Sequence, residues 1–160
     1  INSLEDFYTT SSCSGRFLLF AVPDSNKKNE VQYLFCSHQK IKFAEIKKTI
    51  KKLPKDDVWL KVDPVILHVA CKNIDNAKKF INTARDIGFR KSGIISIGKS
   101  KIILELISTE KIEAIVSKNG KLLIDDYYFK VLVKEGNEKL EKTWKKIDRL
   151  YDNLDNIKMQ

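Results

Sequence analysis

The chain has little of what several common active sites require. Its six glycines never form a G-x-G-x-x-G turn or a Walker loop, so neither usual phosphate-binding loop is available. It has two histidines, and no cysteine or carboxylate lies at ligand spacing from them, which excludes a recognisable zinc set. Three cysteines, Cys13, Cys36 and Cys71, are an odd number without close pairing and favour reduced thiols in the cytoplasm. No apolar run approaches the roughly 20 residues that cross a membrane, and no secretory signal is expected.

Arginine is also scarce in a chain that is otherwise strongly basic. The net charge is +9, from 30 basic and 21 acidic residues, and only four of the basic residues are arginines: Arg16, Arg85, Arg90 and Arg149. A basic excess of this size favours a polyanionic partner. Where lysine is so common, the arginine positions are candidates for sites that need a planar, bidentate cation.

A polar block near the start of the chain is the most unusual feature of the sequence. Residues 8–16 read YTTSSCSGR, in which seven consecutive small or hydroxylated residues end on Arg16 and an apolar run follows. Hydroxyl and backbone N–H groups beside a fixed cation suit an anionic or strongly polar ligand. The alternative is a long Ser/Thr turn without a ligand.

The spacing of apolar residues in the rest of the chain predicts an α+β protein. We expect a mixed or antiparallel sheet with helices packed on it and a long C-terminal helix, and not a doubly wound Rossmann fold. Residues 1–8 are predicted to be the end of a helix, and further helices are predicted over 41–53, 74–87 and 126 to nearly the end. Strands are predicted over 16–22, 31–37, 58–62, 65–71, 94–98, 101–108, 112–117 and 121–125. Tight turns are expected at Pro-Asp-Ser-Asn in the loop 23–30 and at Asn119-Gly120.

The order of these elements indicates an internal duplication. A helix, a Ser-Gly pair and a hairpin occur twice, with the pairs at Ser14-Gly15 and Ser92-Gly93. We therefore predict a single domain over 1–160, with repeat halves 1–53 and 58–109 and a C-terminal hairpin and helix over 112–157.

Several motifs in order along the chain resemble one protein family. The block Tyr8–Arg16 is followed by Ser37-His38, by Lys61-Val62-Asp63-Pro64 leading into Ile66-Leu67-His68-Val69, and by Gly88-Phe89-Arg90-Lys91-Ser92-Gly93-Ile94; weaker blocks follow at 108–109 and 117–122. Together they resemble the tRNA wybutosine-synthesizing protein 3 family over residues 8–122. Asp63 stands where the family usually has Glu, and Ile107 and Ile115 also depart from its pattern.

The resemblance implies a tRNA methyltransferase that depends on S-adenosylmethionine. Its acceptor would be ring nitrogen N4 of the tricyclic wyosine-type base next to the anticodon, at position 37 of phenylalanine tRNA. The implied partner is the anticodon loop of that tRNA, with no DNA and no membrane. The alternative is a module of the same modification pathway that binds tRNA or a metabolite without doing chemistry.

The resemblance also suggests which side chains accept a proton. His68 is the preferred general base, with Asp63 near enough in sequence to orient it, and His38 is the second candidate. Taken on its residues alone, His68 between Leu67 and Val69 is also compatible with a hydrogen-bonded core histidine. A covalent role for Cys13 beside Arg16 is a further alternative.

Binding residues are expected in the same motifs and on one helix. The expected cofactor-binding residues are Ser12, Ser14, Arg16, Arg90 and Ser92. The expected contacts with substrate or RNA are stacking by Tyr8, Phe89 or Trp59 and charge contacts by Lys47, Lys48 and Lys51 on the predicted helix 41–53.

Overall fold

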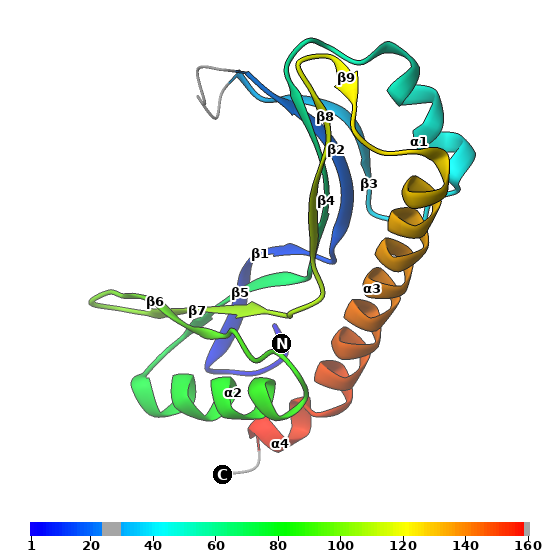
Figure 1. The fold of residues 1–160 in the computed structure, drawn as a ribbon. Coiled ribbons are helices and arrows are strands. Elements are labelled where there is room, and N and C mark those ends of the chain that lie inside the picture. The colour runs from blue at the N-terminus through cyan, green and yellow to red at the C-terminus, as the bar shows by residue number, and fades with distance from the viewer. Residues whose placement is uncertain (24–29, 159–160) are drawn as a thin grey trace. The chain divides into compact units, whose positions relative to one another are not determined.

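The chain folds into two compact units that interleave along the sequence. The structure, a computed structural model, describes residues 1–23 and 30–158. Unit 1 comprises 1–14, 64–109 and the residues from 142 onward, and unit 2 comprises 15–63 and 110–141. Each unit contains one antiparallel sheet with helices packed against it, so the predicted α+β class is confirmed (Figure 1). None of the helices in the described residues is long and apolar enough to span a membrane.

Unit 1 is built on a sheet with the strand order β1-β5-β7-β6. Its strands and helices are β1 (Phe7–Cys13), β5 (Ile66–Cys71), α2 (Ile74–Asp86), β6 (Gly93–Ile97), β7 (Ile102–Ile107) and α4 (Leu154–Lys158). Burial alternates along β7, because Leu104 and Leu106 are fully buried while Ile103 and Glu105 are not. Successive side chains of a strand point to opposite faces, so one face of this sheet packs on α2 and the other carries polar residues.

Local signals explain where α2 begins and ends. The Asn73 side chain caps its start by accepting a 2.9 Å hydrogen bond from the Asn76 amide. Four residues at helical spacing point into the core: Ala77, Phe80, Ile81 and Ala84. Gly88 follows the helix at φ +114°, a conformation that a residue with a side chain rarely adopts. The helix predicted over 74–87 is confirmed.

Unit 2 is built on a sheet with the strand order β3-β2-β4-β8-β9. Its elements are β2 (Arg16–Val22), β3 (Gln32–Ser37), α1 (Phe43–Thr49) with the 3-10 turn η2 (Ile50–Lys52), β4 (Asp57–Asp63), β8 (Ile112–Lys118), β9 (Lys121–Leu122) and the first part of α3 (Asp126–Asp152). Fully buried Phe17, Leu60 and Phe129 form part of its core. The turn between β8 and β9 has positive φ at Asn119 and Gly120, as this residue pair predicts.

The start of the chain differs from the prediction. Residues 1–6 form turns and not a helix, and the polar block that follows is a strand, β1, which pairs antiparallel with β5. Threonine suits a strand, and pairing with β5 satisfies backbone groups that a free Ser/Thr loop would leave to solvent. Residues 1–6 therefore do not supply the first helix of the predicted duplication, whereas both predicted hairpins, β2–β3 and β6–β7, are present.

The C-terminal helices and the strand β9 differ from the predicted elements. The long helix ends at Asp152, and a short helix, α4, follows it. β9 has two residues, where a longer strand was predicted. Most of the turn predicted in 23–30 lies outside the described residues. The single domain with repeat halves 1–53 and 58–109 stays a prediction.

Candidate active site

Three polar side chains form a row across the sheet of unit 1. In the strand register Ser11 of β1 is opposite His68 of β5, which is opposite Glu105 of β7. His68 Nδ1 lies 3.1 Å from Ser11 Oγ, and His68 Nε2 lies 3.0 Å from Glu105 Oε1. The side chains of His68 and Glu105 are 27% and 30% exposed, so the histidine is fixed by partners yet reachable from solvent. We call this group the Ser-His-Glu row.

The hydrogen bonds of the row decide which nitrogen of His68 can accept a proton. An ionised carboxylate can only accept, so Nε2 must carry the hydrogen that points at Glu105. In the neutral ring Nδ1 then holds the lone pair, and the Ser11 hydroxyl donates to it. A proton arriving at Ser11 can therefore pass to Nδ1, and the Glu105 carboxylate stabilises the cation that forms.

The neighbours of the row leave room for a ligand beside it. Gly93 of β6 is opposite Glu105 in the register, and apart from its two neighbours in the chain no heavy atom of the described residues lies within 4 Å of the place where a Cβ would be. Tyr8 is opposite Ala70 on the same two strands as Ser11 and His68, and its side chain is 48% exposed. The Lys101 ammonium lies 5.9 Å from the centroid of the Tyr8 ring. An aromatic ring thus lies near the row on the same sheet.

Sequence reasoning missed Ser11 and Glu105. It assigned the orienting carboxylate to Asp63, whereas the carboxylate hydrogen-bonded to His68 is that of Glu105. Strand register brings these residues together, and register is not visible in one sequence. One signal was available, because Glu105 is the only charged residue in the apolar strand 102–107.

Asp63 takes part in a second polar cluster, which belongs to unit 2. Arg16 Nε lies 3.0 Å from Asp63 Oδ2, and Lys61 Nζ lies 3.3 Å from Asp63 Oδ1. Arg16 and Asp63 are direct register partners on β2 and β4. The three residues line an open groove of about 330 Å³ together with Tyr33 and Phe20, whose rings are tilted with centroids 6.4 Å apart. The groove combines a guanidinium, a carboxylate and aromatic faces.

His38, the second candidate base, lies in unit 2. Its Nδ1 is 3.0 Å from the Gly15 carbonyl oxygen. A carbonyl only accepts, so Nδ1 carries the hydrogen and the lone pair of the neutral ring is on Nε2.

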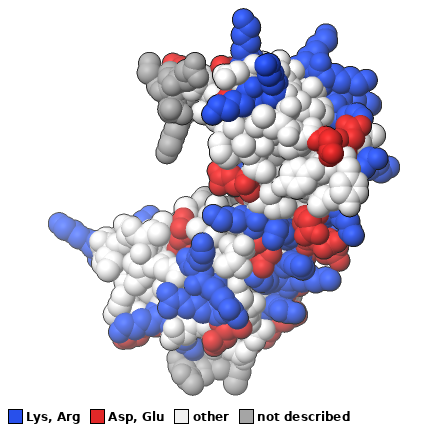
Figure 2. Space-filling model, viewed as in Figure 1, with Lys and Arg blue, Asp and Glu red and all other residues white. Residues whose placement is uncertain are grey.

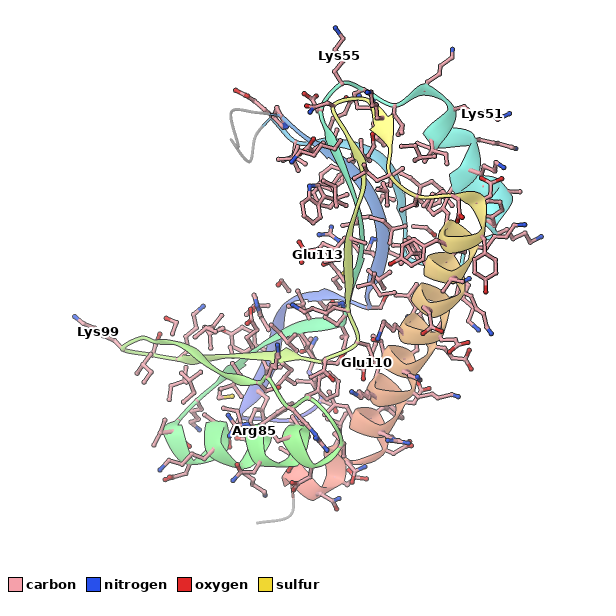
Figure 3. All side chains as sticks on the ribbon, in the orientation of Figure 1. Lys51, Lys55, Arg85, Lys99, Glu110 and Glu113 are labelled. Atoms are coloured by element: carbon pink, nitrogen blue, oxygen red, sulfur yellow. The ribbon has the colours of Figure 1, made fainter. Side chains whose placement is uncertain are left out.

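The remaining serines predicted for cofactor binding have different surroundings. Ser12 is exposed on β1, and the Ser14 carbonyl accepts a 3.1 Å hydrogen bond from Trp144 Nε1. Ser92 is buried, and its hydroxyl donates a 2.6 Å hydrogen bond to the Phe89 carbonyl. Its carbonyl accepts from Arg85, so the Ser92 polar groups stabilise the turn after α2 (Figure 3 labels Arg85).

The residues predicted to contact RNA differ in their exposure to solvent. Phe89 is fully buried in the core of unit 1, so its ring cannot stack on a base, and that prediction is wrong in its geometry. Arg90 next to it is exposed in the turn. On α1 and η2, Lys48 and Lys51 are exposed, whereas Lys47 pairs with Asp126.

The three cysteines differ in burial. Burial raises the pKa of the Cys71 thiol to about 12, so it stays protonated at neutral pH. Cys13 is half-buried at the end of β1, and Cys36 is exposed. Within residues 1–23 and 30–158, no cluster of three or more His, Cys, Asp or Glu side chains is arranged to hold a metal ion.

The chain is similar in sequence to a described protein family, and in sequence and fold to archaeal proteins. A family described as Methyltransferase TYW3 matches residues 1–156. The chain is 38% identical over 160 residues to the tRNA(Phe) 7-((3-amino-3-carboxypropyl)-4-demethylwyosine(37)-N(4))-methyltransferase of Archaeoglobus fulgidus, covering 100% of this chain and 80% of that protein. It is 34% identical over 155 residues to a Pyrococcus furiosus protein that has the same name followed by the number 1. That match covers 97% of this chain and 79% of the Pyrococcus furiosus protein. The fold matches the solved PH1069 protein of Pyrococcus horikoshii with a TM-score of 0.92 and 32% identity, covering 98% of this chain and 79% of that one.

Proposed function

Because the chain belongs to the methyltransferase TYW3 family, we propose that it methylates N4 of the wyosine-type base at position 37 of tRNA(Phe), with S-adenosylmethionine as methyl donor. In this reaction the bond from N4 to the methyl carbon forms while the methyl–sulfur bond breaks, and its electron pair stays on sulfur. The acceptor nitrogen gives up one proton. The chain must therefore align the acceptor, exclude water and take up that proton.

The observation that supports this proposal most strongly is the Ser-His-Glu row. His68 Nδ1 is the proton acceptor, and Ser11 is the group through which the proton reaches it. Glu105 fixes the tautomer of the ring and offsets the positive charge that appears on it. The open space next to Gly93 and the exposed ring of Tyr8 lie on the same sheet, where a flat tricyclic base has a surface to stack on.

The groove of unit 2 supports a site for the methyl donor. S-adenosylmethionine carries a carboxylate, an ammonium group and an adenine ring. Arg16 is suited to the carboxylate, Asp63 to the ammonium group or a ribose hydroxyl, and the rings of Phe20 and Tyr33 to the adenine. The groove volume of about 330 Å³ is within the range of small-molecule sites.

Exposed lysines on unit 2 support RNA binding. Lys48 and Lys51 are proposed to contact phosphates, and Lys47 contributes less because Asp126 already neutralises it. Such contacts hold any RNA without reading its sequence.

The proposal is tested by a methyl-transfer assay on tRNA(Phe) that carries the base without its N4 methyl group. Radiolabelled S-adenosylmethionine reports transfer, and digestion of the product identifies the methylated nucleoside. The unchanged chain is expected to label this nucleoside, and His68→Ala is expected to lower kcat by about 10²- to 10⁴-fold, the usual contribution of a general base. His38→Ala is the matched variant of the second histidine. If His38→Ala loses activity and His68→Ala does not, the general base is His38. No transfer by the unchanged chain would reject the proposed function.

The cofactor site is tested separately by calorimetric titration with S-adenosylmethionine. Arg16→Ala is expected to weaken binding at least about tenfold, because a charge-assisted pair contributes about 1.5–3 kcal/mol. Arg149→Ala removes an exposed arginine of α3 and is the control. Equal affinities of the unchanged chain and Arg16→Ala would place the donor elsewhere.

A further inference from the structure

The β6–β7 hairpin and the turn before it carry positive charge, with no acidic residue before Glu105. Residues 88–104 contain four basic side chains, Arg90, Lys91, Lys99 and Lys101, and no Asp or Glu. We propose that this hairpin, residues 93–107, is an arm that binds the single-stranded RNA on one side of the target base. The inference rests on the proposed function, and it specifies a surface of unit 1 that RNA contacts.

Uncovered isoleucines distinguish this arm from an ordinary hairpin. Ile95 and Ile97 are 51% and 71% exposed, and Ile94 lies beside them at the edge of the sheet. Among residues 1–23 and 30–158, β6 pairs with β7 alone, so within this part of the chain the other edge of β6 presents unpaired backbone groups. Natural sheets commonly protect such an edge, and exposed apolar residues next to it indicate a surface that a partner covers.

The charges around these isoleucines indicate that the partner is a polyanion. Lys99 lies in the turn between β6 and β7, Lys101 follows the turn, and Figure 3 shows Lys99 at the far end of the hairpin. In Figure 2 the far end of the hairpin is basic and the surface behind it is largely uncharged. Lys101 also lies over the exposed ring of Tyr8, so a cation, an aromatic face and apolar side chains occur together. That combination suits single-stranded RNA, whose bases stack on aromatic or apolar groups while lysines contact phosphates.

The arm continues from the candidate active site. Gly93, its first residue, is the register partner of Glu105, and Ile97 pairs with Ile102 at the other end of the strand. Four residues of strand span about 13 Å. A target base beside Glu105 therefore leaves the nucleotides next to it within reach of the isoleucines. A duplex would hide its base faces, so the arm favours an unpaired loop.

Binding is tested by fluorescence anisotropy with a labelled RNA hairpin that has the sequence of the tRNA(Phe) anticodon stem and loop. The arm variant is Lys99→Gln with Lys101→Gln. The control is Lys78→Gln with Lys142→Gln, which removes the same charge from exposed lysines of α2 and α3 in unit 1. Two lost contacts with single-stranded phosphates are expected to weaken binding about tenfold at 0.15 M salt and to reduce the log–log salt slope by about 1.4. The control is expected to bind like the unchanged chain.

A second variant tests the apolar part of the arm without a change of charge. Ile97→Ser is expected to weaken binding to the RNA hairpin several-fold and to leave binding to a fully paired RNA duplex unchanged. Leu123→Ser is its control, because Leu123 is similarly exposed at 55% but lies in unit 2. Both positions are at the surface, so the melting temperatures are expected to stay within about 2 °C of the unchanged chain.

Several outcomes would overturn the inference. If the arm variant and the lysine control lose RNA affinity equally, the loss is an effect of net charge and not of the arm. If neither variant loses RNA affinity, the arm does not bind the RNA. If the arm variants bind RNA normally but lose binding to phosphatidylserine vesicles, the partner of the arm is a membrane surface. If they bind RNA normally but lose self-association in sedimentation, the partner is a second copy of the chain. If the unchanged chain transfers methyl groups while the arm variants bind RNA normally, only the arm is rejected.

Discussion

Gly136 lies in the middle of α3, where an alanine would ordinarily favour the helix by about 1 kcal/mol. Its position is buried against the sheet of unit 2. A Cβ at Gly136 would lie 2.9 Å from Phe17 Cζ, closer still to Phe17 Cε2, and 3.0 Å from Val62 Cγ2. Phe17 and Val62 are both fully buried, so neither can move aside without disturbing the core.

Overpacking of this kind costs up to about 3 kcal/mol, which outweighs the gain in helix propensity. Gly136→Ala is therefore expected to lower the free energy of unfolding by about 2 kcal/mol and the Tm by about 4–8 °C. Thermal unfolding followed by circular dichroism measures the shift, and Lys134→Ala at an exposed site of the same helix is the control.

A double-mutant cycle with Phe17→Leu isolates the clash. The smaller side chain leaves space at the helix surface, so Gly136→Ala is expected to cost at least about 1 kcal/mol less in that background. An increase of Tm in Gly136→Ala alone would refute the reasoning, because helix propensity would then outweigh the contact with Phe17.

Other predictions follow from the remaining contacts. Iodoacetamide is expected to modify Cys36 and to spare Cys71 in the folded chain at pH 8.5, because the raised pKa of the Cys71 thiol, about 12, keeps it protonated. Peptide mass spectrometry would measure the modification of each cysteine. Because that pKa lies above the ordinary value of 9.0, the stability due to the neutral thiol is complete below about pH 9 and is lost as the pH rises toward 12. In urea unfolding, the free energy of unfolding of Cys71→Ala should therefore decline less over this range than that of the unchanged chain. Asn73→Ala is expected to cost about 1 kcal/mol in urea unfolding through loss of the α2 cap. Asn137→Ala is expected to cost about 1–3 kcal/mol in the same assay, because it deprives the Ile41 N–H and carbonyl of hydrogen bonds of 3.0 and 2.8 Å.

Much of the fold was predictable because its signals are local. Apolar spacing marked α2, and Gly88 marked its end. The Asn119-Gly120 pair marked the β8–β9 turn. The strand β1 was missed because its serines and threonines are typical of a turn, and only pairing with β5 makes them a strand.

The candidate site was predictable only in part. His68 was identified through the motif around it, yet its partners come from strands 57 residues before it and 37 residues after it in the chain. Such pairs depend on register, which a single sequence does not reveal. The burial of Phe89 was likewise hidden, because an aromatic residue after a helix fits both a core and a stacking surface.

The central claim is that Glu105 holds His68 in the state that accepts the proton released by methylation. The most direct test is the rate of single-turnover methyl transfer by the unchanged chain and by Glu105→Gln, measured above neutral pH. Replacing a charge-assisted hydrogen bond with a neutral one costs about 1–1.5 kcal/mol, so the rate above neutral pH is expected to fall about tenfold. Glu105→Asp, which keeps the negative charge, is expected to restore part of the rate. An unchanged rate in Glu105→Gln, with normal binding of tRNA, would contradict the account.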